Sequence, residues 1–156
     1  MITKNAVSIQ FSEADLQSVK EALATLKTIL GPQLIALSPS ERQTVPKMSD
    51  GTLPFVEKVM DYAQSDNQFL PPYVDLQELE KDWLAVKELM PLLRDLQQLE
   101  SNLNDTLMMA GSEAYVGALS YYNSVKYGAK VNAADAKVIY EDLKQRFDKS
   151  AKRVSN

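Results

Sequence analysis

Apolar residues recur every three or four positions along most of this chain, which is the spacing of one helix face. The clearest run extends from Asp75 to Met109, and polar residues fill most of the positions between its apolar ones. We predict one long amphipathic helix there, with a kink or break at Pro91, because proline cannot donate the helical hydrogen bond. Its apolar positions are Leu76, Leu79, Trp83, Val86, Leu89, Met90, Leu93, Leu96, Leu99, Leu103 and Leu107.

Capping and stop signals predict further helices around this one. Ser12 followed by Asp15 begins the first helix, and Gly31–Pro32 ends it. The others are a short turn capped by Ser38 and Glu41, a helix over 53–65, a helix from Ser112 to about Tyr127 after a break at Gly111, and a last helix that begins at Asn132.

Val7, Ile9 and Phe11 alternate with polar residues, which is the period of a strand, but no second strand exists to pair with it. We therefore expect residues 1–11 to form an extended arm and residues 149–156 to form a frayed tail. A chain of 156 residues suits one domain, 1–156. The predicted fold is an all-α, mostly antiparallel bundle of four to five helices.

The chain contains no histidine and no cysteine. Catalytic triads, thiolate nucleophiles, zinc sites with Cys or His ligands, and the Glu-x-x-His sites of di-iron bundles are therefore impossible. Glycine-rich phosphate loops and calcium loops are also missing from the sequence. We expect no catalytic residue of these classes, no metal and no cofactor.

The net charge of −4 makes nucleic acid a poor partner, because phosphate binding needs clustered Lys and Arg. The charge is uneven: the net charge is −8 up to Val125 and +4 from Lys126 onward. The basic end is either a solvated helix face or a docking site for an acidic partner. No apolar run reaches the ~18 residues that span a membrane, and the start of the sequence lacks signal-peptide features, so the expected location is the cytoplasm.

One candidate site lies on the predicted helix after Ser112. A buried Glu113 beside Tyr121 and Tyr122 would have a raised pKa and could bind a ligand or transfer a proton. The alternative is structural, because Glu113 in a first turn would complement the helix dipole and tyrosines often edge a core.

Arg42 is a second candidate, since it could bind an anion beside exposed helix amides, although capping alone explains Ser38 and Glu41. Methionines are a third candidate, because they either fill the core or line an adaptable apolar groove. They are Met48, Met60, Met90, Met108 and Met109.

Two segments resemble parts of uncharacterised bacterial helical proteins. They are Ala36–Gln43 (Ala-Leu-Ser-Pro-Ser-Glu-Arg-Gln) and Asp105–Lys126, which contains Met-Met-Ala-Gly-Ser-Glu-Ala-Tyr and Tyr-Tyr-Asn-Ser-Val-Lys. The resemblance covers about Leu23 to Phe147. It implies a helical fold and a bacterial source, and it implies no activity, cofactor or site residue.

The leading functional hypothesis is a non-enzymatic interaction or scaffold module. The long leucine stripe would bury part of its length against a protein partner or a second copy, giving a homodimer. The alternatives are a bundle that binds a small ligand or lipid near Pro91, and an enzyme that uses Glu113 with a tyrosine.

Overall fold

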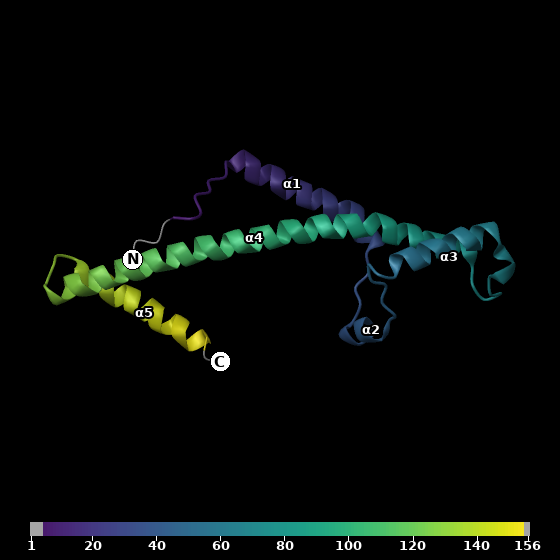
Figure 1. Cartoon of the computed structure of the whole chain (residues 1–156). Coiled ribbons are helices and arrows are strands. Elements are labelled where there is room, and N and C mark those ends of the chain that lie inside the picture. The colour runs from purple at the N-terminus through teal and green to yellow at the C-terminus, as the bar shows by residue number, and fades with distance from the viewer. Residues whose placement is uncertain (1–4, 155–156) are drawn as a thin grey trace. The chain divides into compact units, whose positions relative to one another are not determined.

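The structure, a computed structural model, describes the backbone of residues 5–154 and the side chains of residues 5–146. These residues form five α-helices and no strand, which confirms the all-α prediction (Figure 1). Residues 5–11 have no regular structure, and residues 1–4 of the predicted arm lie outside the described part. The elements are α1 (Glu13–Leu30), η1 (Gly31–Gln33), α2 (Pro39–Thr44), α3 (Leu53–Ser65), η2 (Asn67–Phe69), α4 (Leu76–Lys130) and α5 (Ala136–Val154).

The chain divides into two compact units, one formed by Gln10–Gln97 and the other by Met1–Ile9 with Gln98–Asn156. The boundary falls inside α4, so this helix contributes its first turns to one unit and its later turns to the other. The single domain predicted over 1–156 remains a prediction. The predicted tail, 149–156, begins within α5, whose backbone is helical to Val154, and residues 155–156 lie outside the described part.

In the unit Gln10–Gln97, local capping fixes where the short helices begin. The Ser12 hydroxyl accepts the backbone N–H of Asp15 at 3.0 Å and begins α1. At α2, the Ser38 hydroxyl accepts the N–H of Glu41 at 3.3 Å, and the Glu41 carboxylate accepts the N–H of Ser38 at 2.7 Å. Both predicted caps are confirmed, because each depends on residues only three positions apart.

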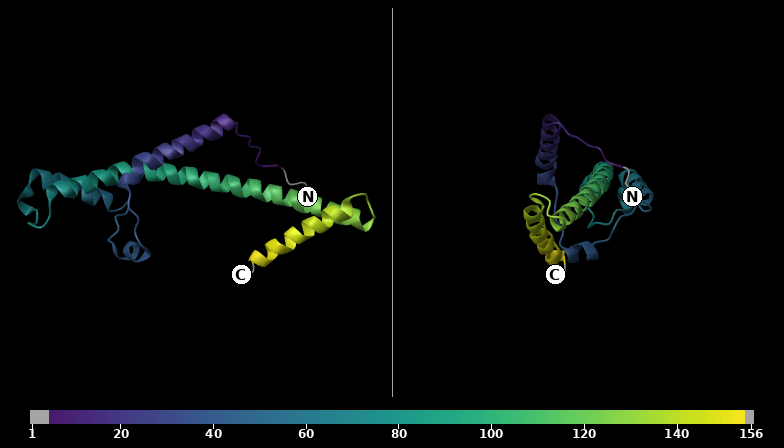
Figure 2. Two further views of the ribbon diagram at one scale, coloured as in Figure 1. Left: turned by 180° about the vertical axis from the view of Figure 1, so that it is seen from behind. Right: turned by 90° about the vertical axis from the view of Figure 1, so that its left-hand side faces the viewer.

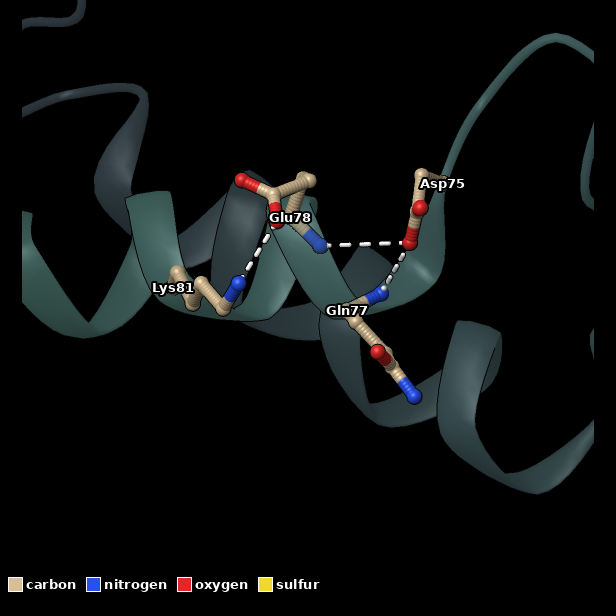
Figure 3. A network of polar contacts seen from close by, with 4 residues as sticks. All are labelled: Asp75, Gln77, Glu78 and Lys81. Carbon is tan, nitrogen blue, oxygen red and sulfur yellow. Dashed lines mark hydrogen bonds and ion pairs between the residues drawn. The ribbon is translucent and has the colours of Figure 1, made fainter.

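The first turn of α4 is also capped from the residue before it. The Asp75 carboxylate accepts the N–H groups of Gln77 at 2.8 Å and Glu78 at 3.3 Å (Figure 3). Glu78 in turn pairs with Lys81 one turn later, at 2.6 Å. A carboxylate at this end satisfies free amides and complements the positive end of the helix dipole.

Helix α3 lies beside the first turns of α4, and its bounds match the predicted 53–65 (Figures 1 and 2). Met60 is 3% exposed and Ala63 is buried, so they form the best-covered apolar contact of this unit. Gln64 on α3 donates to the Glu80 carboxylate on α4 at 2.9 Å, and Arg94 on α4 pairs with Asp50 before α3 at 2.9 Å. Both polar bonds are solvent-exposed, so they link α3 and Asp50 to α4 without adding much stability.

Helix α4 corrects the prediction of two separate helices, because it is continuous through both expected interruptions. Pro91 lies inside α4, so the helix does not end there. Gly111 and Ser112 also lie inside it, so Ser112 is not an N-cap and Glu113 is not in a first turn. A glycine costs a helix only about 1 kcal/mol relative to alanine, which many good helix formers on either side offset.

The turn between α4 and α5 corrects two further boundaries. Helix α4 passes Gly128 and ends at Lys130, and α5 begins at Ala136 rather than at Asn132. Asn132 and Asp135 adopt φ values of 56° and 61°, a left-handed conformation that Asn and Asp tolerate better than most residues. A Cβ at Gly128 would lie 3.2 Å from the Cβ of Ala136, so glycine allows this close return of the chain.

In the described part of the chain, no helix combines the length and the apolar character needed to cross a membrane.

Candidate functional site

Glu113 binds the N-terminal arm and does not join a cluster of tyrosines. Its carboxylate accepts the backbone N–H of Ala6 at 2.6 Å, and its side chain is half-buried on α4. The expected dipole role is wrong, because residue 113 lies in the middle of a helix of 55 residues. The contact holds a free amide of the arm against α4, within one unit of the chain.

Tyr121 and Tyr122 lie eight and nine residues after Glu113 on α4, so about two helical turns separate them from it. Tyr122 packs against Tyr140 of α5, with ring centroids 5.6 Å apart. Tyr121 is 57% exposed. The structure therefore places Tyr121 and Tyr122 at the α4–α5 contact, and Glu113 is not among the residues that line the hollow there. An acid–base pair of Glu113 with a tyrosine stays a prediction.

Beside this contact, α4 and α5 enclose an open hollow of about 530 Å³. Figures 1 and 2 show α5 folding back along the end of α4 and then separating from it. The surface of the hollow is mostly apolar, with Arg146 as its charged member. Its lining residues are Tyr115, Gly117, Ala118, Leu119, Tyr121, Tyr122, Leu143 and Arg146.

Arg42 lies on the short helix α2, in the other unit, and is exposed. The anion-binding prediction finds no support from neighbouring groups, because the nearby amide of Ser38 is bound by Glu41. Hydrogen bonds from the Ser38 side chain and backbone lower the pKa of Glu41. The capping interpretation explains Ser38 and Glu41 completely, and Arg42 remains a surface cation.

A second apolar groove, of about 810 Å³, lies within the unit Gln10–Gln97. Met48 and Met90 line it, as the groove interpretation of the methionines expected. Met60 is instead buried on α3, and Met108 and Met109 are exposed. The apolar pattern did not indicate that Leu30, at the end of α1, and Leu34, after η1, line this groove, because they reach it only through the folding of the chain.

Three leucines on one side of α4, which we call the leucine face, are exposed to solvent. Leu99, Leu103 and Leu107 are 63%, 64% and 69% exposed, although they belong to the most regular apolar pattern in the sequence. Predicted bundle packing would have buried them. In the described part of their unit, neither α5 nor the arm covers these side chains.

Among the described side chains, no group of three acidic, histidine or cysteine residues is arranged to hold a metal ion. No family model, no curated protein and no solved structure matches this chain.

Proposed function

We propose that this protein is a non-enzymatic interaction module that forms a homodimer through the apolar face of α4. The observation that carries the proposal is the exposure of Leu99, Leu103 and Leu107 on a regular helix. Surface leucines are ordinary when they are scattered, but a contiguous apolar face of this kind marks an interaction site.

A stable interface needs about 800 Å² from each partner. The leucine face and the hollow between α4 and α5 belong to the same unit, so a second copy can contact both surfaces. The antiparallel bundle predicted from the sequence would then be completed by helices from two chains.

Light scattering coupled to size exclusion tests the proposal. At tens of micromolar the protein should elute with about twice the mass of 17.4 kDa, since a specific interface with a micromolar dissociation constant is mostly formed at that concentration. A mass of one chain throughout that range would contradict it.

A second candidate, binding of a small apolar ligand, is favoured by the groove of about 810 Å³ lined by Leu30, Met48 and Leu93. Its volume falls within the range of ordinary ligand pockets, about 300–1,000 Å³. Calorimetry with a medium-chain fatty acid tests this candidate. Saturable binding that is lost in Val86→Trp, which would fill the groove, supports it, and no heat at about 1 mM fatty acid contradicts it.

A further inference from the structure

The apolar face of α4 has two halves of different size, both within the unit that contains Gln98–Asn156. The first half carries Leu99, Leu103 and Leu107, and the second carries alanines at 110, 114 and 118. The apolar positions of this face repeat every 11 residues. One series consists of positions 99, 110 and 121, and a second series consists of positions 103, 114 and 125. Eleven residues make about three full turns, so this repeat keeps all these positions on one side of a straight helix.

The small half borders the open hollow described above. Gly117, Ala118 and Tyr121 line it from α4, and Leu143 lines it from α5. A Cβ built on Gly117 would meet no atom within 4 Å, so this side of the helix is open. A cavity of ~150 Å³ suffices for a benzene ring, so a hollow of about 530 Å³ has room for about three side chains of leucine size.

The same stretch of α4 is unusually poor in charge. From Ser101 to Val125 the charged residues are Asp105 and Glu113 alone. Glu113 is bound to the Ala6 amide, and Asp105 lies about half a turn away from Leu103 and Leu107. The face itself carries no charged residue at positions 99, 103, 107, 110, 114 and 118, so a second copy brings no charge directly against it.

Building on the homodimer proposed above, we propose that two copies pair antiparallel through α4, with the two-fold axis near Ser112. Leu103 of one copy then lies opposite Tyr121 of the other, and Leu107 lies opposite Ala118. The large half of each copy fills the hollow of its partner, so α4 and α5 of both copies form a four-helix core. Leu107 faces the small side chain of Ala118 and Leu103 enters the hollow beside Tyr121, and such complementary surfaces interdigitate at native packing density.

A parallel pair satisfies these observations less well. It would set leucine against leucine at 103 and 107 and alanine against alanine at 114 and 118. Both hollows would then stay open, and their linings would lose the contacts that packing supplies.

Disulfide trapping tests the orientation, and the chain offers a clean background because it has no cysteine. Leu103→Cys and Tyr121→Cys are prepared separately, mixed and oxidised. In the antiparallel pair each variant alone separates its two thiols by about 27 Å along the helix, beyond the ~7 Å between Cα atoms that a disulfide spans. The mixture should therefore form the disulfide at a yield at least about tenfold above either variant alone. Efficient self-crosslinking of each variant, with no mixed product, would overturn the proposal.

A second measurement uses positions outside the apolar face, because substitutions on the face itself could weaken the dimer. Spin labels on Ser101→Cys should lie at least about 33 Å apart, whereas labels on Ser112→Cys should show only the lateral separation of the two helices. Equal, short distances at both positions indicate a parallel pair and overturn the orientation alone. A monomeric mass by light scattering overturns the homodimer itself, so the two failures are distinguishable.

Discussion

Two stretches of apolar helix surface in this protein differ in burial: one is covered within the chain and the other is exposed. Near the beginning of α4, the α3 side chains Met60 and Ala63 are buried, and Gln64 and Arg94 make exposed polar bonds beside them. Further along α4, Leu103 and Leu107 are equally regular in the sequence yet more than 60% exposed. The apolar periodicity of a helix therefore indicates which of its faces is suited to burial. It does not indicate which other segment or chain covers that face.

The difference follows from chain connectivity. A short connection of about ten residues, closed by Pro71 and Pro72, returns the chain from α3 to α4, so α3 is held close to the first turns of α4. Leu99 to Leu107 have no such neighbour close in sequence, and the contacts described for α5 lie further along α4, between Tyr115 and Tyr122. A second copy is the partner that the proposed dimer supplies.

The largest effect is expected from removing the exposed leucines. Leu103→Gln with Leu107→Gln changes four side chains in a symmetric dimer, each worth about 1.5 kcal/mol or more when buried. The loss of about 6 kcal/mol should leave the variant monomeric at tens of micromolar in sedimentation experiments.

The matched control places the same change on the opposite side of the helix. Met109 and Val116 are also exposed, 46% and 45%, and lie about half a turn from Leu107. Met109→Gln with Val116→Gln should leave the dimer unchanged. Equal loss of the dimer in both double variants would show that general helix destabilisation, and not the leucine face, is responsible.

A substitution at the buried residue Met60 should lower the stability of the folded chain and leave dimer formation unchanged. Met60→Ala removes a side chain that is 3% exposed and should lower the free energy of unfolding by about 2–5 kcal/mol. Urea unfolding followed by circular dichroism measures it. Dissociation of a stably folded Met60→Ala dimer would contradict the separation of the two regions.

The arm offers a smaller test. Glu113→Ala removes the acceptor of the Ala6 N–H, a charge-assisted bond worth about 1.5–3 kcal/mol at most and less at a partly exposed site. Amide exchange at Ala6 should accelerate, while Glu113→Gln, which keeps an oxygen acceptor, should retain part of the protection. Unchanged exchange at Ala6 in both variants would show that the bond does not hold the arm.

The smallest effect is expected from pH at α2. Because the pKa of Glu41 is lowered in the folded chain, its contribution to the cap is present above the unfolded value of about 4.3. It is lost as pH falls through the lower, folded value. Amide exchange at Ser38, corrected for its intrinsic pH dependence, should lose protection in that acid range, and Glu41→Gln should remove the pH dependence.

Local signals in the sequence predicted the parts of the fold that depend on neighbouring residues. The Ser12 cap, the Ser38–Glu41 box and the bounds of α3 are of this kind. The continuity of α4 through Pro91 and Gly111 was not predictable from breaker residues alone, because their penalties of about 3 and about 1 kcal/mol compete with the whole helix around them. The turn at Asn132 and Asp135 likewise depends on φ angles that composition does not specify.

The candidate site was predictable only in part. Tyr121 and Tyr122 do lie at a helix contact, as their mixture with small residues suggested. The partner of Glu113 was not predictable, because Ala6 is 107 residues away and contributes a backbone amide, which leaves no mark in the sequence. The resemblance to bacterial helical proteins and the homodimer stay predictions.

Amide hydrogen exchange at two protein concentrations tests directly whether a second copy covers the leucine face of α4. If a second copy covers Leu99 to Leu107, exchange in this segment should slow markedly between about 1 and 100 μM, because protection then includes dimer dissociation. Amides around Met60 and Ala63 should change less, because their cover comes from the same chain. Exchange at Leu99 to Leu107 that is fast and identical at both concentrations would contradict the proposed dimer.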